Sequence, residues 1–218
     1  MTTDAQLPLI VVFTRAPVLG RVKTRLARAV GERAAFDLHR TLLERTLDAV
    51  TGSGMDAEIW VDGDPAALPA HRLPVRHQRS GSGDLGERML DAIVDVTSRQ
   101  RTAILIGSDC PLLDAPYLCA AAKFLADGAD LVVGPVEDGG YVLIGMPKPH
   151  PELFFGMTWS TPDVYAQTLR RAKDVRLATA VLDQLWDVDD EAGWRRWLKL
   201  IGAMPPTTTD PRSSKSSE

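Results

Sequence analysis

Short apolar runs alternate with segments of helical periodicity along most of the chain, and this alternation limits the folds that it can adopt. The first run, Leu9 to Thr14, is a continuous and mostly β-branched stretch, typical of a strand buried on both faces of a parallel sheet. From Glu32 to Val50 the apolar residues recur at helical spacing. This alternation predicts an α/β fold: a mostly parallel sheet between two helical layers, a three-layer α/β/α Rossmann-like architecture.

The same patterns place the other elements. Further strands are predicted over residues 57–63, 75–78, 103–109, 130–136 and the apolar run after Gly140. Further helices are predicted from a glycine-rich loop at 80–84 to Val96, and over 116–126, 161–172 and 191–200. We therefore expect a single domain over residues 1–202. Residues 203–218 are rich in Pro, Ser and Thr and have almost nothing apolar to bury, so they are predicted to be a disordered tail.

Composition restricts the class of function. The 218 residues carry a formal net charge of −4, which argues against a general nucleic-acid binder because such proteins present a broad basic face. No apolar run reaches the ~18 residues of a membrane span, and no signal peptide pattern is visible. Cys110 and Cys119 are interpreted as reduced thiols. We expect a cytoplasmic protein without a membrane span.

A cluster of cations follows the first strand, where Pro17 bends the chain. It comprises Arg15, Arg21, Lys23 and Arg25, with Gly20 among them. The spacing matches neither a Walker A loop nor a dinucleotide-binding Gly-x-Gly-x-x-Gly. A glycine beside spaced cations at the start of a helix can still bind phosphates through backbone N–H groups and charge, so we predict a phosphate loop. A solvated basic turn is the alternative.

Acidic residues follow two later strands. In open α/β sheets the ligand binds outside the carboxyl ends of the strands, so these residues should meet the basic loop. In "IGSDCP", Ser108 and Asp109 end an apolar run, and Asp109 suits a Mg²⁺ or Mn²⁺ ion bridged to substrate phosphates. The alternative for Asp109 is the cap of the helix after Pro111.

The stretch "GPVEDGGYVLIG" joins an acidic pair to two glycines. Asp138 is predicted to bind the metal or the acceptor, and Tyr141 to shape the pocket. Gly139 and Gly140 would let the backbone approach a ligand closely or adopt a positive φ angle. A tight β-hairpin turn is the alternative.

Three further features carry weaker signals. Gly83 and Asp84, in "SGSGDLGER", would bind a base or ribose, or Asp84 would cap the following helix. Asp187 and Asp189 alternate on an extended segment and suit a second metal contact; a cap of the last helix at Asp189 or Asp190 is the alternative. Thr161 and Pro162 fit an ordinary helix N-cap and first position. The histidines show no ligand spacing and are interpreted as surface or loop residues: His39, His71, His77 and His150.

Five ordered stretches together resemble a known family. "FTRAPVLGRVKTRLA", "GSDCPLL", "GPVEDGGYVLIG", "MTWST" and "WDVDD", spread over residues 8–200, are similar to a bacterial family of glycosyltransferase-A-like proteins. Some of its members are identified as arsenosugar-biosynthesis glycosyltransferases. The wider nucleotide-diphospho-sugar transferase superfamily also includes the molybdenum-cofactor and 2-phospholactate guanylyltransferases.

The resemblance implies a GT-A fold and a metal-dependent reaction at an activated phosphate. By position, Arg15, Lys23 and Arg25 would hold phosphates, Asp109 would be the metal carboxylate, and Asp138 would lie beside it. Trp159 of "MTWST" would belong to the substrate site. One departure matters: the Asp-x-Asp of many glycosyltransferases is Ser108-Asp109-Cys110 here, which leaves a single carboxylate.

The expected activity is glycosyl transfer from a nucleoside-diphosphate sugar to a small acceptor, with Mg²⁺ or Mn²⁺. Nucleotidyl transfer with release of pyrophosphate is the first alternative, because the basic loop suits a triphosphate. A non-catalytic nucleotide-binding module is the second. The sequence does not predict the donor, the acceptor, the anomeric outcome or the oligomeric state.

Overall fold

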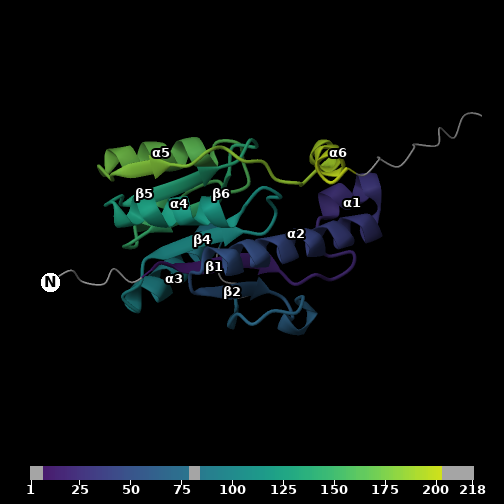
Figure 1. Ribbon diagram of the computed structural model, residues 1–218. Helices are drawn as coiled ribbons and strands as arrows, with labels where there is room; N and C mark the ends of the chain where they lie inside the picture. Colours follow the sequence, from purple (N-terminus) through teal and green to yellow (C-terminus); the bar gives the residue numbers. More distant parts are fainter. Residues whose placement is uncertain (1–6, 79–83, 203–218) are drawn as a thin grey trace, which may run out of the picture.

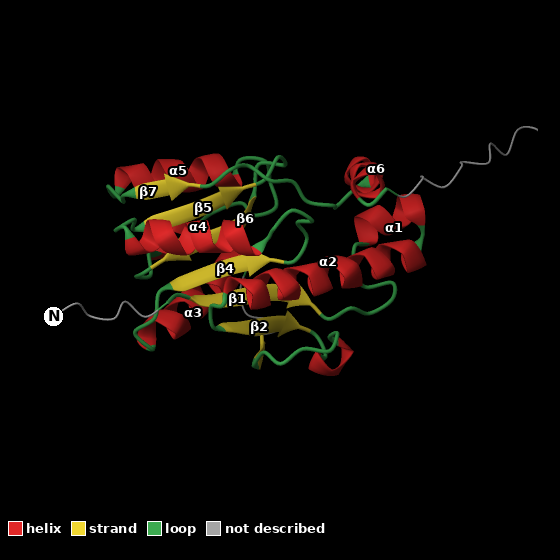
Figure 2. Ribbon diagram, viewed as in Figure 1, coloured by secondary structure: helices red, strands yellow, loops and turns green. Residues whose placement is uncertain are grey.

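The computed structural model describes residues 7–78 and 84–202. At its centre is a seven-stranded sheet of order β3-β2-β1-β4-β6-β5-β7 (Figures 1 and 2). The strands are β1 (Leu9–Arg15), β2 (Ala57–Asp62), β3 (Val75–His77), β4 (Ala103–Gly107), β5 (Leu131–Pro135), β6 (Tyr141–Met146) and β7 (Thr179–Val181). Strand β6 runs antiparallel to both of its neighbours, β4 and β5, whereas the other neighbouring strands pair in parallel. The predicted mostly parallel sheet is confirmed.

Helices cover both faces of this sheet. They are α1 (Thr24–Val30), α2 (Glu32–Ser53), α3 (Leu85–Ser98), α4 (Ala115–Ala126), α5 (Val164–Asp174) and α6 (Glu191–Leu200), with 3₁₀ turns η1 (Pro65–Ala67) and η2 (Pro151–Leu153). Leu43 of α2 and Leu118 of α4 belong to the same core cluster as Ile10 of β1. Ile93 of α3 belongs with Val11 to the core on the opposite face, which α5 also covers. The three-layer α/β/α fold is therefore as predicted.

Local sequence explains where several helices begin. Asp84 caps α3 by accepting a hydrogen bond from the Glu87 amide at 3.0 Å, which confirms its capping role. Asp114 caps α4 through the Tyr117 amide at 2.9 Å. Asp190 caps α6 in the same way. Because Asp190 provides this cap, the Asp189 side chain is left available for other contacts.

A third apolar cluster lies beyond the carboxyl edge of the sheet, where α1 and α6 sit together above the end of α2 (Figure 1). Trp186 and Trp197 pack there with Leu26 of α1 and Leu42 of α2. This packing brings the segment before α6 next to the β1–α1 loop. Residues far apart in the sequence thus share one edge of the sheet.

Two elements differ from expectation. Strand β7 was not predicted, because its three residues are too few to show a pattern and they pair only at the sheet edge. Helix α5 begins at Val164, so the predicted cap at Thr161 is wrong: its hydroxyl instead donates to the Thr158 carbonyl at 2.9 Å. Gly83 and the predicted tail at 203–218 lie outside the described residues. In the part of the chain that the structure describes, no helix is both long and apolar enough to cross a bilayer.

Candidate functional site

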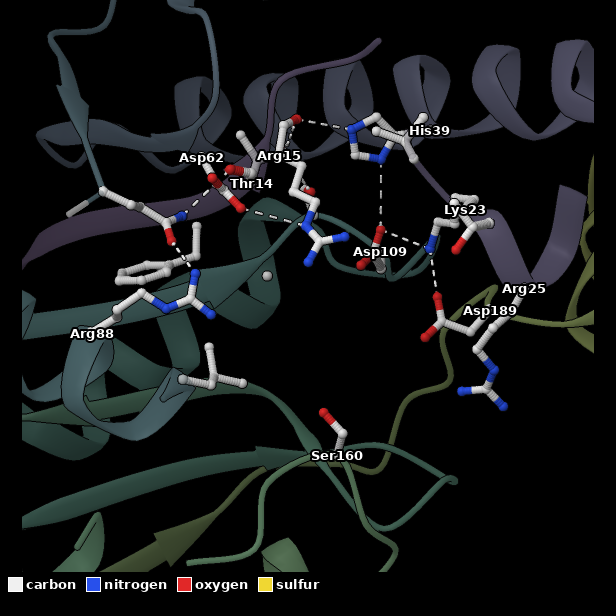
Figure 3. A pocket seen from close by; sticks show the side chains of 17 residues that line it. Thr14, Arg15, Lys23, Arg25, His39, Asp62, Arg88, Asp109, Ser160 and Asp189 are labelled. Atoms are coloured by element: carbon white, nitrogen blue, oxygen red, sulfur yellow. Dashed lines mark hydrogen bonds and ion pairs between the residues drawn. The ribbon is translucent and has the colours of Figure 1, made fainter. Parts of the chain in front are cut away.

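A cleft of about 400 Å³ opens at the carboxyl edge of the sheet (Figure 3). Its walls come from the ends of β1 and β4, the β1–α1 loop, α2, the first turns of α3, and the segments at residues 160 and 189. Ser160 lies across the cleft from His39 and Lys23 (Figure 3). The predicted site residues that line this cleft are Arg15, Lys23, Arg25, Ser108, Asp109 and Asp189.

Lys23 occupies the floor of the cleft between two carboxylates. Its Nζ atom lies 2.7 Å from Asp109 Oδ1 and 2.7 Å from Asp189 Oδ1, and only 4% of its side chain is exposed. The residue precedes α1 with left-handed backbone angles (φ 47°, ψ 41°), a conformation that is costly outside glycine. Burial alone would lower the pKa of the Lys23 ammonium, but the charges of Asp109 and Asp189 outweigh it and raise the pKa.

Asp109 directs its carboxylate into the cleft and not toward a helix. The alternative cap after Pro111 is wrong, since Asp114 caps α4. Burial would raise the pKa of Asp109, but the neighbouring Lys23 charge holds it below its usual value. Asp109 is therefore ionised at neutral pH, as a metal-binding carboxylate must be.

Further carboxylates lie close to this pair. The pKa of Asp187 is raised to about 7 by burial and by the charges of Asp189 and Asp138, with Asp109 adding to the effect. Within residues 7–78 and 84–202, no group of three or more His, Cys, Asp or Glu side chains is arranged to hold a metal ion. The gathered negative charge nevertheless fits Mg²⁺ or Mn²⁺, because such ions commonly take one or two protein carboxylates and complete their shell with water and substrate phosphates.

Three arginines surround the acidic floor. Arg15 lies 3.6 Å from Asp62 and is 67% exposed, and Arg25 lies beside Asp189 (Figure 3). Arg88 enters from α3 and donates from Nη1 to the Gln78 side chain at 3.1 Å, while its buried Nε has no partner in the part of the chain that the structure describes. Gly20 and Arg21 of the predicted loop do not line the cleft. Gly20 instead provides a turn at φ +76° beside Glu32.

The "GPVEDGGY" stretch forms the tight turn between β5 and β6. Asp138 Oδ1 accepts a hydrogen bond from the Gly140 amide at 2.8 Å, so the hairpin alternative is confirmed for this segment. Gly139 has a φ of +88° and lies against the Pro162 carbonyl, where a side chain would not fit. Tyr141 buries its hydroxyl, which meets no hydrogen-bond partner among the described residues, and burial raises the pKa of Tyr141. These residues do not line the cleft.

Trp159 also lies outside the cleft lining. Its indole ring covers Gly86 at the start of α3 and stacks on Phe154 at a centroid distance of 6.3 Å. Gly86 must therefore be glycine for this packing. Trp159 supports the wall that carries Ser160, its neighbour in the chain.

Sequence reasoning missed several residues of the cleft, among them His39 and Arg88. His39 is 4% exposed and not a surface residue, so that interpretation is wrong. Its Nε2 lies 3.0 Å from the Arg15 carbonyl, which can only accept, so Nδ1 carries the lone pair and faces Asp109 Oδ1 at 4.0 Å. Burial lowers the pKa of His39. The signal was its position on the apolar stripe of α2, between Leu38 and Leu42. Arg88 stands one turn after Leu85.

Comparison with known proteins identifies the family. Residues 43–161 match DUF2064, described as "uncharacterized protein conserved in bacteria". The chain belongs to the DUF2064 family. No protein of curated function matches the chain in sequence.

Solved structures support the fold of this DUF2064 protein. It is similar to a "putative nucleotide-diphospho-sugar transferase" from Desulfovibrio desulfuricans G20, with 29% identity, a TM-score of 0.81, and coverage of 96% of this chain and 92% of that one. A nucleotidyl transferase from a Methanothermobacter species matches at 13% identity and TM-score 0.58, covering 89% and 97% of the two chains. A manganese complex of Rv0371C from Mycobacterium tuberculosis H37Rv matches with 17% identity and a TM-score of 0.53, and the match covers 89% of this chain and 99% of that one. The predicted superfamily fold is confirmed.

Proposed function

We propose that this DUF2064 protein is a metal-dependent transferase that acts on a nucleotide-activated substrate in the cleft. One observation carries the proposal: the Asp109 and Asp189 carboxylates lie together at the cleft floor, on either side of Lys23, and three arginines surround them. Carboxylates and guanidinium groups in one small cleft suit a ligand that brings both phosphates and a divalent cation. The similarity to the Desulfovibrio protein supports the proposed transferase function.

Each group has a defined task in this proposal. Arg15, Arg25 and Arg88 bind phosphate oxygens by charge-assisted hydrogen bonds. Asp109 and Asp189 hold Mg²⁺ or Mn²⁺, and Asp187 and Asp138 lie near them. When bound, the cation stabilises the negative charge that develops on the leaving phosphate. The manganese complex of the mycobacterial relative of the same fold is consistent with this choice of ion.

We favour glycosyl transfer from a nucleoside-diphosphate sugar to a small acceptor. In that reaction the sugar C–O bond breaks, and the nucleoside diphosphate leaves. The five-motif resemblance, including its arsenosugar-biosynthesis members, and the 29% identity to the Desulfovibrio protein support this class. Ser160 lies on the wall opposite Lys23, and we expect the acceptor to enter the cleft from that wall.

Nucleotidyl transfer is the second candidate. The cleft holds Arg15, Lys23, Arg25 and Arg88, which is enough positive charge for a triphosphate. A nucleotidyl transferase shares the fold, although this likeness concerns the fold alone. A cleft that binds nucleotide without turnover would instead favour the non-catalytic module.

Product analysis tests these alternatives. Calorimetry of the purified chain with UDP-, GDP- and CDP-linked sugars and with nucleoside triphosphates, each with and without Mn²⁺, identifies the ligand. Incubation with that ligand and candidate acceptors then shows the product. Release of a nucleoside diphosphate supports glycosyl transfer, and release of pyrophosphate supports nucleotidyl transfer. If no nucleotide binds in the presence of Mn²⁺, the proposed function is wrong.

A further inference from the structure

Lys23 holds the place at the cleft floor that a divalent cation needs. One ammonium group lies 2.7 Å from an oxygen of Asp109 and 2.7 Å from an oxygen of Asp189, two carboxylates from segments that are far apart in the chain. In both carboxylates the atom that contacts the ammonium is Oδ1. A metal ion that bridged these two Oδ1 atoms would occupy the space that the Lys23 ammonium fills.

We propose that Lys23 is a built-in counter-ion that competes with the divalent cation for Asp109 and Asp189, so that binding of the cation expels the lysine side chain. The inference rests on the proposed function and adds its regulation. In the absence of the cation, the Lys23 ammonium offsets part of the negative charge of the two carboxylates. Loading the cation frees one ammonium group inside a cleft where phosphate oxygens are expected.

Three observations make the competition specific to Lys23. Its side chain is almost fully buried, whereas that of Arg15 is 67% exposed and pairs with Asp62. Its backbone is held at φ 47°, in the left-handed region, at the first residue before α1. Since such a conformation persists only when its surroundings stabilise it, the two ion pairs are the natural compensation. Arg25 lines the same cleft but makes no ion pair within the described residues.

The competition predicts an order of events. With Lys23 in place, Mn²⁺ alone should bind weakly, because it must displace the ammonium from both Oδ1 atoms before it can bridge the two carboxylates. A phosphate-bearing substrate gives the expelled ammonium a new partner, so cation and substrate should bind cooperatively. The coupling is reciprocal by thermodynamic necessity: each ligand strengthens the other by the same factor.

Direct measurement of Mn²⁺ affinity tests the proposal without any turnover assay. The proteins are the parent, Lys23→Met, and Arg25→Met as the matched control, since each variant removes one positive charge from the same cleft. Removing a competitor should tighten Mn²⁺ binding in Lys23→Met by about tenfold or more, within the usual range of coupling between two ligands. Arg25→Met should change the Mn²⁺ affinity by less than about threefold, since only screened long-range charge is lost. Calorimetry or the Mn²⁺ paramagnetic signal gives both affinities.

A second measurement uses the parent chain and so does not depend on how well a variant folds. In protein labelled with ¹⁵N-lysine, the buried and paired ammonium of Lys23 should give a protected signal, whereas exposed lysines such as Lys123, with 74% of its side chain exposed, should exchange rapidly. Adding Mg²⁺ should abolish this protection.

The outcomes separate the inference from the proposed function. If the parent binds Mn²⁺ and Lys23→Met binds it no more tightly, or if Mg²⁺ binds while the Lys23 signal stays protected, the counter-ion role is wrong and the metal site stands. If none of the three proteins binds Mn²⁺, even with a nucleotide, the metal site is wrong and both proposals fail. Tighter binding in Lys23→Met alone supports the competition.

Discussion

At the scale of single residues, the Asp109 carboxylate gives the sharpest test of the proposed metal site. Asp109→Asn keeps the size of the side chain but removes the charge that pairs with Lys23 and that would hold the cation. We predict at least a ~100-fold fall in turnover of the identified nucleotide substrate, equivalent to about 2.7 kcal/mol. The unfolding free energy should fall by only ~1–2 kcal/mol, because Asp189 still pairs with Lys23. Steady-state kinetics and denaturant melts of the same preparations give both numbers.

The matched control is Asp62→Asn. Asp62 also lines the cleft, but its partner is the exposed Arg15, at 3.6 Å. Its loss should cost much less turnover, and less than about 1 kcal/mol of stability. Near-normal turnover of Asp109→Asn would refute the metal assignment. An equal loss in both variants would mean that general cleft charge, and not a specific carboxylate, matters.

At the scale of elements, Glu58 links strand β2 to strand β3 and to the end of helix α3. This buried carboxylate of β2 accepts bonds from Arg99 at 2.9 and 3.2 Å, from Trp60 at 2.8 Å, and from Arg76 of β3 at 3.2 Å. Burial would raise its pKa, but the bonds from Arg99 and Trp60 and the arginine charges hold it below the usual 4.5. The folded pKa is lower than the unfolded one, so the stabilisation is complete above pH ~4.5 and is lost as the pH falls through the folded pKa.

Glu58→Gln should therefore destabilise the protein by about 3–5 kcal/mol at pH 7, because two arginines lose a buried partner. The difference from the parent should shrink as the pH falls below about 4.5, where the parent carboxylate also becomes protonated. Urea melts from pH 3 to 8 measure this. Glu44→Gln is the control, since its pair with Arg40 is exposed on α2 and should contribute at most ~0.5 kcal/mol. A pH-independent difference for Glu58→Gln would contradict the electrostatic explanation.

At the scale of the whole molecule, the cleft lies where three segments that are far apart in the sequence meet. The β1–α1 loop, the end of β4 and the segment before α6 meet through Lys23, Asp109 and Asp189. A ligand that bridges these segments should stabilise the whole fold. At 100 times its Kd, nucleotide with Mn²⁺ should add about 2.7 kcal/mol to the unfolding free energy. For a chain of this size that corresponds to a rise in Tm of roughly 5–10 °C.

Scanning calorimetry with Mn²⁺ alone, nucleotide alone, both together, and both with excess EDTA checks this expectation. The combined ligands should stabilise more than the sum of the two separate effects, and EDTA should remove the excess. Additive shifts would argue against a shared site. No shift under any condition would argue against nucleotide binding itself.

The sequence by itself determined the elements, the layers and the edge that carries the cleft. The continuous apolar run of β1, the apolar stripes of the helices and the capping aspartates Asp84 and Asp190 are local signals, because each depends on residues close in the chain. The rule that ligands bind at the carboxyl ends of parallel strands then brought Arg15, Lys23 and Asp109 to one place.

Only the tertiary structure decided what these residues do to one another. Lys23 meets Asp189 across 166 positions of sequence because Trp186 and Trp197 pack α6 against α1 and α2. His39 is buried on α2 beside the Arg15 carbonyl and Asp109, whereas the local turn of β5 into β6 engages Asp138 with the Gly140 amide. A side chain's partners depend on which distant segments pack beside it. Spacing along the chain therefore indicates which residues reach the edge of the sheet, and packing between segments decides which charges touch.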